Sequence, residues 1–107
     1  MNNEVKARWI QALKSGNFQQ GKNSLHYENK FCCLGVLCEL AVENNVSSYE
    51  RSVDSSYTYY DGGSTTPAAR VLNWAELESI TVETLIRMND SYENSFETIA
   101  NYIEENL

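Results

Sequence analysis

The chain has 107 residues, the size of one domain that can bury a core without disulfides or a structural metal. Hydrophobic residues make up 42% of the sequence and aromatic residues 11%, which excludes a disordered segment. Fifteen acidic against eight basic residues give a net charge of −7, which opposes non-specific attraction to nucleic acid or anionic lipid. We therefore expect a single domain, residues 1–107, that has no nucleic-acid or membrane partner and folds alone or as a small homo-oligomer.

The first predicted element is a helix over residues 4–15. Asn3 can cap its amino terminus through the side-chain oxygen, and Gly16 can adopt the left-handed conformation that ends a helix. Apolar residues recur at helical spacing along one side, which predicts that the helix packs by that side on the core. This stripe consists of Val5, Trp9, Ala12 and Leu13.

Two short strands are predicted next, within residues 17–27. They flank a turn at Gly21-Lys22-Asn23, because glycine and asparagine both tolerate the positive φ that tight turns require. A second turn at residues 28–30 leads into the following segment. A β-hairpin between two helices indicates an α+β fold rather than a helical bundle.

The run from Phe31 to Val42 is apolar on every side, which is typical of a buried helix. It has about a dozen residues and is too short to cross a bilayer, which needs roughly 20. We expect a central core helix that the other elements cover.

All three cysteines, Cys32, Cys33 and Cys38, lie in this run, where they cannot pair neatly with one another. The amino terminus has no basic-then-apolar signal pattern, so we expect free thiols in a reducing cytoplasm. Cys38 is four residues from both Leu34 and Val42, which places it on a stripe that faces the interior. We expect its thiol to be inert.

Residues 46–66 change character, because Ser, Thr, Asp, Gly and Tyr dominate them. Tyr57 and Tyr59 alternate with Thr58 as in a strand, and Asp61-Gly62-Gly63 is a turn signal. We predict a loop or an irregular hairpin inserted into the domain. It is either a solvated insertion or a tyrosine-lined lid, since loops on a rigid scaffold commonly carry binding residues.

Two helices are predicted after this insertion. Thr66 can cap the first, residues 67–74, whose opening proline loses no hydrogen bond at that position. Thr81 can cap the second, residues 82–88. A hydrophobic staple around that start would consist of Ile80 and Leu85.

Ser95 is placed to cap a last helix over residues 96–107, which carries an apolar stripe beside several acids. The predicted fold is therefore α+β, with four to five helices around a buried central helix and one or two short antiparallel β-hairpins. The acids that gather near this end are Glu93, Glu97, Glu104 and Glu105.

A cysteine hydrolase is one chemical interpretation of the central run. The unpaired amides at a helix start lower a thiol pKa, so Cys32 or Cys33 could serve as nucleophile with His26 as base. Buried cysteines more often behave as small hydrophobic residues, which is the competing interpretation. The spacing of the cysteines and the histidine fits no closed zinc site, and we expect no metal or cofactor.

A ligand site is the second interpretation. Polar, basic and aromatic residues could form a pocket edge that meets phosphate, ribose and base. Each has a structural alternative: a simple turn at residues 20–22, a core anchor at Trp74, and capping at the helix end for Asn89 and Asp90. The candidate ligand-binding residues are Gln20, Lys22, Arg70, Trp74, Tyr57, Tyr59, Asn89 and Asp90.

Several segments together resemble a family of small proteins from tailed bacteriophages and prophages. The most specific segment is Phe31-Cys32-Cys33-Leu34-Gly35-Val36-Leu37-Cys38. The segments that add to the resemblance are residues 8–16, Gln20-Gly21-Lys22, Met88-Asn89-Asp90, Ser95-Phe96 and Ile99-Ala100. The resemblance skips the segment 46–66. Met88 stands where related sequences often show leucine.

The resemblance implies a phage accessory protein in the host cytoplasm that acts against host defence. One hypothesis is that it sequesters a cyclic nucleotide or a cyclic ADP-ribose-type signal without turnover. The alternative is an acidic module that binds and inhibits a host defence enzyme, which the net charge of −7 favours.

Overall fold

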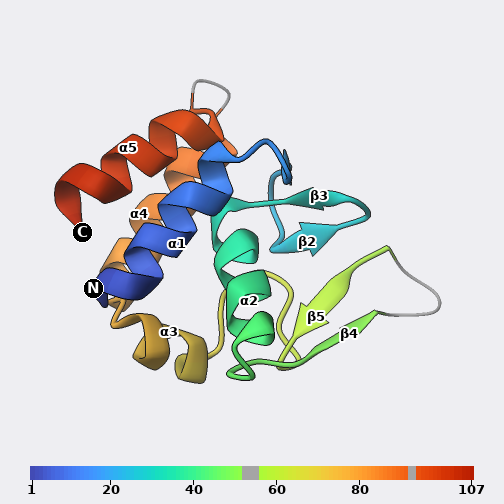
Figure 1. The fold of residues 1–107 in the computed structure, drawn as a ribbon. Coiled ribbons are helices and arrows are strands. Elements are labelled where there is room, and N and C mark those ends of the chain that lie inside the picture. Colours follow the sequence, from blue (N-terminus) through green and yellow to red (C-terminus); the bar gives the residue numbers. More distant parts are fainter. Residues whose placement is uncertain (52–55, 92–93) are drawn as a thin grey trace.

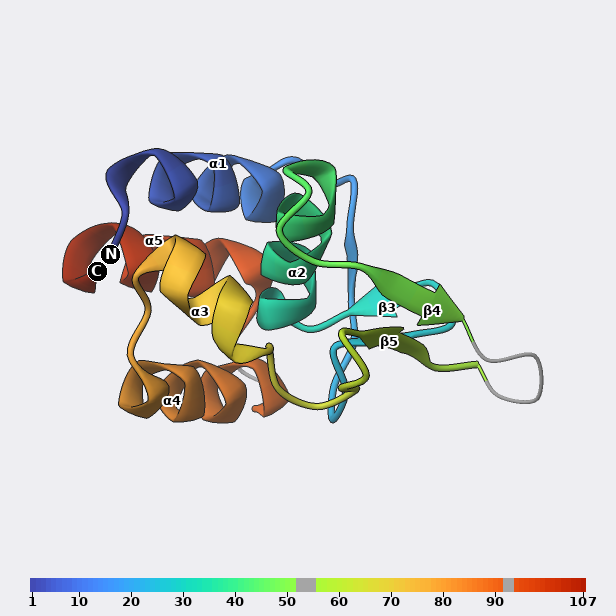
Figure 2. The ribbon, with the colours of Figure 1, turned by 90° about the horizontal axis from the view of Figure 1, so that it is seen from below.

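The computed structural model describes residues 1–51, 56–91 and 94–107. These residues form five α-helices and two small β-sheets, an α+β fold. The helices gather on one side of α2 and the strands extend from its other side (Figure 1). Seen from below, α1, α3, α4 and α5 lie together while β4 and β5 project away from them (Figure 2).

Helix α2, Cys33–Glu43, is the buried central helix that its apolar composition predicts. Its residues from Cys33 to Cys38 are all buried. The backbone of Leu25 runs so close to α2 that a Cβ on Gly35 would collide with the Leu25 carbonyl. Trp9 is fully buried and its indole Nε1 donates to the Cys33 carbonyl at 2.9 Å. The first helix is thereby fixed on the start of α2.

Helices α1, Asn3–Lys14, and α5, Phe96–Asn106, pack against each other through their apolar stripes. Asn2, rather than Asn3, caps α1, because its Oδ1 accepts from the Val5 amide at 3.0 Å. The predicted Ser95 cap of α5 is confirmed, since its hydroxyl accepts from the Thr98 amide at 3.2 Å.

Helices α3, Ala69–Ala75, and α4, Ser79–Asp90, begin at other positions than the cap signals predict. Pro67 is buried in the segment before α3, so the helix begins two residues later, after Ala68, and Thr66 is not its cap. Helix α4 begins before Thr81, directly after Glu78. The predicted staple is wrong, because Ile80 is 69% exposed.

The first sheet has the strand order β1-β3-β2. Its strands are β1 (Gln19–Gln20), β2 (His26–Tyr27) and β3 (Lys30–Phe31). The predicted hairpin around Gly21-Lys22-Asn23 is wrong: β1 pairs in parallel with β3, and the antiparallel hairpin is β2–β3. Gly21 does not have a positive φ. It allows close packing instead, because a Cβ there would lie 2.7 Å from the Lys30 Cβ.

Strands β4, Tyr49–Arg51, and β5, Thr58–Tyr60, form an antiparallel pair within the predicted insertion. Residues 52–55 of that insertion lie outside the described residues. The hairpin interpretation is confirmed, but the insertion is not solvated throughout, because Tyr60 is fully buried. No helix among the described residues is long and apolar enough to cross a membrane.

Candidate functional site

The two sheets are joined side by side. Tyr27 of β2 forms an isolated antiparallel bridge with Tyr57, just before β5, and the Glu28 amide donates to the Ser56 carbonyl at 2.8 Å. The strands therefore follow one another as β1-β3-β2-β5-β4. Residues directly opposite each other on neighbouring strands point to the same side, so this register decides which side chains meet.

The outer side of these strands carries a group of tyrosines, which we call the tyrosine row: Tyr27, Tyr57 and Tyr59. The ring centroids of Tyr27 and Tyr57 are 4.8 Å apart, and those of Tyr57 and Tyr59 are 6.5 Å apart. Tyr27 is 41% and Tyr57 39% exposed, so part of each side chain is accessible from solvent.

Charged residues flank the tyrosine row at both ends. Lys30 is the cross-strand partner of Tyr27, and Glu50 is the partner of Tyr59. Both are exposed. Rings that offer flat faces beside a single ammonium can hold a planar heterocycle and an adjacent anionic group. The carboxylate at the other end disfavours further negative charge there.

The inner side of the same strands carries a hydrogen-bonded chain that reaches α2, which we call the inner triad: His26, Tyr60 and Glu39. The Tyr60 hydroxyl donates to Glu39 Oε2 at 2.8 Å and lies 3.0 Å from His26 Nδ1. Tyr60 has one hydroxyl hydrogen, which goes to Glu39, so its oxygen accepts from His26 Nδ1–H. This bond assigns the tautomer of His26.

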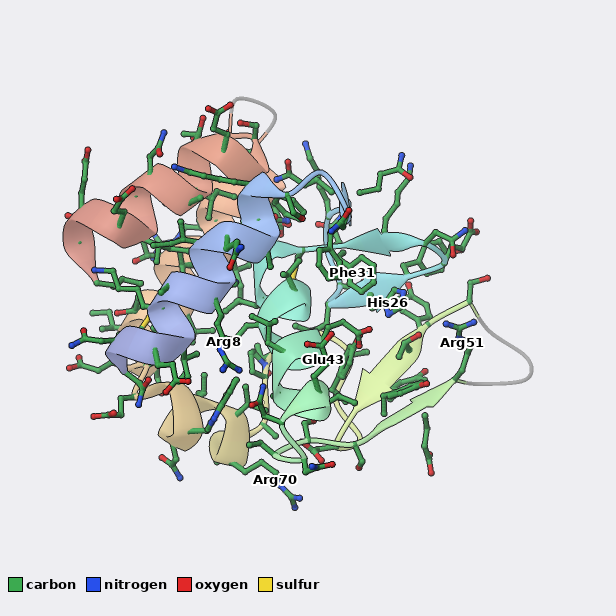
Figure 3. All side chains as sticks on the ribbon, viewed as in Figure 1. Arg8, His26, Phe31, Glu43, Arg51 and Arg70 are labelled. Atoms are coloured by element: carbon green, nitrogen blue, oxygen red, sulfur yellow. The ribbon has the colours of Figure 1, made fainter. Side chains whose placement is uncertain are left out.

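The surroundings of the inner triad keep its histidine and tyrosine uncharged at neutral pH. His26 is 6% exposed and stacks on Phe31 with a centroid distance of 3.9 Å. Figure 3 shows the two rings beside each other, with Arg51 on β4, the strand beyond β5. Burial lowers the pKa of His26, against the opposing effect of Glu39. Burial and the Glu39 carboxylate raise the pKa of Tyr60 far above its usual value.

Three of the predicted ligand-binding residues belong to an internal hydrogen-bond network. The fully buried Asn89 accepts on Oδ1 from Gln20 Nε2 at 3.1 Å and from the Cys33 amide at 3.0 Å. Its amide nitrogen donates to the Gly21 carbonyl at 2.8 Å. Asp90 accepts from the Asn23 amide at 3.1 Å. This network joins the end of α4 to the start of α2 and to the turn after β1.

Among the other predicted ligand-binding residues, Lys22 lies in the turn that this network holds, while the rest lie elsewhere. The ammonium of Lys22 is buried. Arg70 lies 3.7 Å from the Asp61 carboxylate, at the end of the molecule away from His26 and Phe31 (Figure 3). Trp74, on the same helix α3, lines a small pocket beside Asn2 and Arg8. The structure thus divides the predicted pocket edge among separate places, and Tyr57 and Tyr59 are the members that share the tyrosine row.

The cysteines do not have the surroundings of a nucleophile. Cys32 caps α2, and its Sγ accepts from the Gly35 amide at 3.3 Å. Burial nevertheless raises the pKa of the Cys32 thiol to about 11, because loss of hydration outweighs the helix amides. Burial also raises the pKa of Cys33 and of Cys38. The raised pKa values favour the competing interpretation, in which the cysteines are small hydrophobic residues of the core, and His26 bonds to Tyr60.

Sequence reasoning missed Tyr27, Lys30 and Glu50 and considered His26 only as a partner for cysteine. The available signal was the alternation at Tyr57-Thr58-Tyr59-Tyr60, which separates an outer from an inner side. Strand pairing was needed to place Lys30 and Glu50 on the outer side. Within residues 1–51, 56–91 and 94–107, no group of three or more His, Cys, Asp or Glu residues could hold a metal ion.

Comparison with known proteins gives one match. A family profile described as a domain of unknown function, DUF8296, matches residues 1–107. No curated protein and no solved structure matches the chain.

Proposed function

Because the chain belongs to the DUF8296 family, whose description names no activity, we propose a function from the site itself. The protein binds a nucleotide-derived signalling molecule on the tyrosine row and withholds it without turnover. In this proposal it acts in the host cytoplasm as a phage accessory protein against host immunity, the role that the resemblance to phage proteins implies.

The observation that carries this proposal is the row of partly exposed tyrosine rings beside Lys30. Stacking of a base on an aromatic ring contributes about 1–3 kcal/mol and tolerates different bases, since every base has a flat face. Lys30 supplies a charge for one phosphate. The net charge of −7 disfavours a long polyanion, so a small ligand fits better than a nucleic acid.

Sequestration needs binding groups rather than a nucleophile, and the groups described fit that requirement. The thiols of Cys32, Cys33 and Cys38 are buried with raised pKa values, so they are protonated at neutral pH. His26 is covered by Phe31 and directed at Tyr60. Both features favour binding and release of the ligand without chemical conversion.

Titration calorimetry against cyclic dinucleotides and ADP-ribose derivatives tests the proposal. Tyr57→Ala should weaken binding about tenfold or more, the loss of one stacking contact. Tyr49→Ala is the matched control: Tyr49 is 53% exposed but pairs with Tyr60, so it points to the inner side. The Tyr49→Ala variant should bind the ligand with the affinity of the wild type. The proposal would be overturned if no ligand gave a heat of binding, or if both variants lost affinity equally.

A second candidate is docking of a host defence enzyme on the acidic side of α5. Glu97, Glu104 and Glu105 are exposed there, whereas Glu93 lies outside the described residues. Lys14 lies 3.9 Å from the Glu104 carboxylate and offsets part of that charge, which ranks this candidate second. A pull-down from host lysate at low salt tests it: a specifically retained host enzyme, lost with Glu97→Lys and Glu105→Lys, would favour it.

A further inference from the structure

The inner triad lies directly behind the tyrosine row. His26 and Tyr27 are neighbours on β2, and Tyr59 and Tyr60 are neighbours on β5. Successive side chains of a strand point to opposite sides, so each strand presents one residue of the triad inward and one tyrosine outward. The bond from His26 to Tyr60 therefore holds β2 next to β5, where Tyr27 meets Tyr57, the residue just before β5.

The inner triad also fixes both strands on the core. Tyr60 donates to Glu39, which belongs to the central helix. Among the described residues, the backbone of β2 is joined to the β5 strand by one isolated bridge, between Tyr27 and Tyr57, and by the bond from the Glu28 amide to the Ser56 carbonyl. Among the described residues, the side-chain bonds of the triad thus add substantially to a short backbone connection.

We propose that the inner triad positions the tyrosine row and that a second proton on His26 opens the row, so that ligand is held at neutral pH and released in mild acid. This inference rests on the proposed function, of which it is the regulation. The histidine is the positioning residue: it acts through Tyr60 and Tyr27 and does not touch the ligand.

The electrostatic surroundings set the direction of this effect. At neutral pH His26 uses Nδ1–H for Tyr60, and acid adds a proton to Nε2. Two charged groups act on the ring. Glu39 of α2 stabilises the protonated ring, and Arg51 of β4 destabilises it. A hydrogen bond to the Glu28 backbone also stabilises the protonated ring. Phe31 of β3 is uncharged and stacks on one face of the ring. Burial outweighs the favourable contributions, so the charged ring is better accommodated where β2 has moved toward water.

The first experiment needs no ligand. Nuclear magnetic resonance follows the His26 ring and the rings of Tyr27 and Tyr57 between pH 7.5 and pH 5. The tyrosine signals should shift with the same midpoint as His26, below the 6.5 of an ordinary histidine. In His26→Asn the amide can still donate to Tyr60 and does not titrate, so the tyrosine signals should stay constant. Tyrosine signals that ignore the His26 titration would overturn the inference.

The second experiment measures binding of cyclic di-AMP, a probe whose phosphodiesters keep their charge over this range. The wild type should lose about tenfold in affinity between pH 7.5 and pH 5.5, whereas His26→Asn should lose little. Binding that is equal at both pH values would overturn the inference and leave the proposed function standing. Absence of binding at both values would count against the proposed function, while the resonance titration still decides the inference.

Glu39→Ala, which removes the Tyr60 acceptor, provides a second variant should His26→Asn fail to fold. It should show at pH 7.5 the tyrosine signals that the wild type shows in acid.

Discussion

Gly35 shows how one residue sets the distance between the central helix and the strands. A Cβ at this position would collide with the Leu25 carbonyl, and backbone cannot move aside as a flexible side chain can. We expect Gly35→Ala to lower the free energy of unfolding by about 3 kcal/mol, at the upper end for overpacking. Urea unfolding followed by circular dichroism measures the loss.

Gly16→Ala is the matched control, because Gly16 has a φ of 79° but nothing near its missing Cβ. That substitution should cost about 1 kcal/mol through backbone strain alone. Equal losses for the two variants would mean that the approach of Leu25 to α2 is not tight.

Cys38 tests whether the central helix is core throughout. It is fully buried, as its spacing predicts, and burial raises its pKa. Cys38→Ala should destabilise by about 1 kcal/mol, the cost of removing one small buried group. Cys38→Asp should unfold the domain by burying an unpaired charge. A thiol-reactive dye should label Cys38 in the native protein far more slowly than in denaturant, and equal rates would contradict its burial.

At the scale of elements, Asn89 ties α4 to two other parts of the chain. Its side chain accepts from Gln20 and from the Cys33 amide and donates to the Gly21 carbonyl. Asn89→Ala would leave several buried groups without a partner, so we expect a loss of about 3 kcal/mol in unfolding free energy. Gln20→Ala removes one of these bonds and should cost about 1 kcal/mol. Chemical denaturation of both variants compares them, and a smaller loss for Asn89→Ala would refute the central role of this residue.

Local signals predicted the helices better than the sheet. Apolar stripes placed α1 and α5, and a run that is apolar on every side placed α2. The Ser95 cap was readable because capping depends on residues three apart. The parallel pairing of β1 with β3 depends on chain segments about ten residues apart, which no turn signal reports. The helix caps predicted at Thr66 and Thr81 are wrong. Pro67 and Leu77 are buried, and their burial sets where the chain lies before α3 and before α4.

The candidate site was harder to predict for the same reason. Tyr57 and Tyr59 were foreseeable from composition, but Tyr27 joins them only through a bridge that spans 30 residues. Asn89 and Gln20 had been considered as ligand contacts or turn residues, and their contact with each other depends on tertiary packing. The pKa of Cys32 depends on how deeply α2 is buried, which outweighs its position at a helix start.

At the scale of the whole molecule, α2 separates a helical part from the strands (Figure 1). The inner triad links α2 to β2 and β5, and Asp61 links the segment before β4 to α3 through Ser47 and Arg70. Both links contain a group whose pKa differs from its ordinary value. The stability of the molecule should therefore depend on pH at two separate places.

For both groups the unfolded chain binds protons more readily than the folded one. His26 has a lowered pKa in the fold, so its contribution to stability is complete above 6.5 and is lost as pH falls below that value. Partial burial raises the pKa of Asp61, but the bonds from Ser47 and Ser48 and the charge of Arg70 outweigh it and lower the pKa below 3.8. Its contribution is complete above that value and is lost as pH falls through the folded pKa.

We therefore expect the free energy of unfolding to fall in two steps on acidification, the first just below pH 6.5 and the second below about pH 4. His26→Asn should remove the first step and leave the second, whereas Asp61→Asn should do the reverse. Urea unfolding at pH 7.5, 5.5, 4.5 and 3 measures both. Because both links run through the end of β5, at Tyr60 and at Asp61, tyrosine signals from the strands should change before the helical circular dichroism does. A single step at which both signals change together, unaltered in either variant, would show that other groups control the acid response.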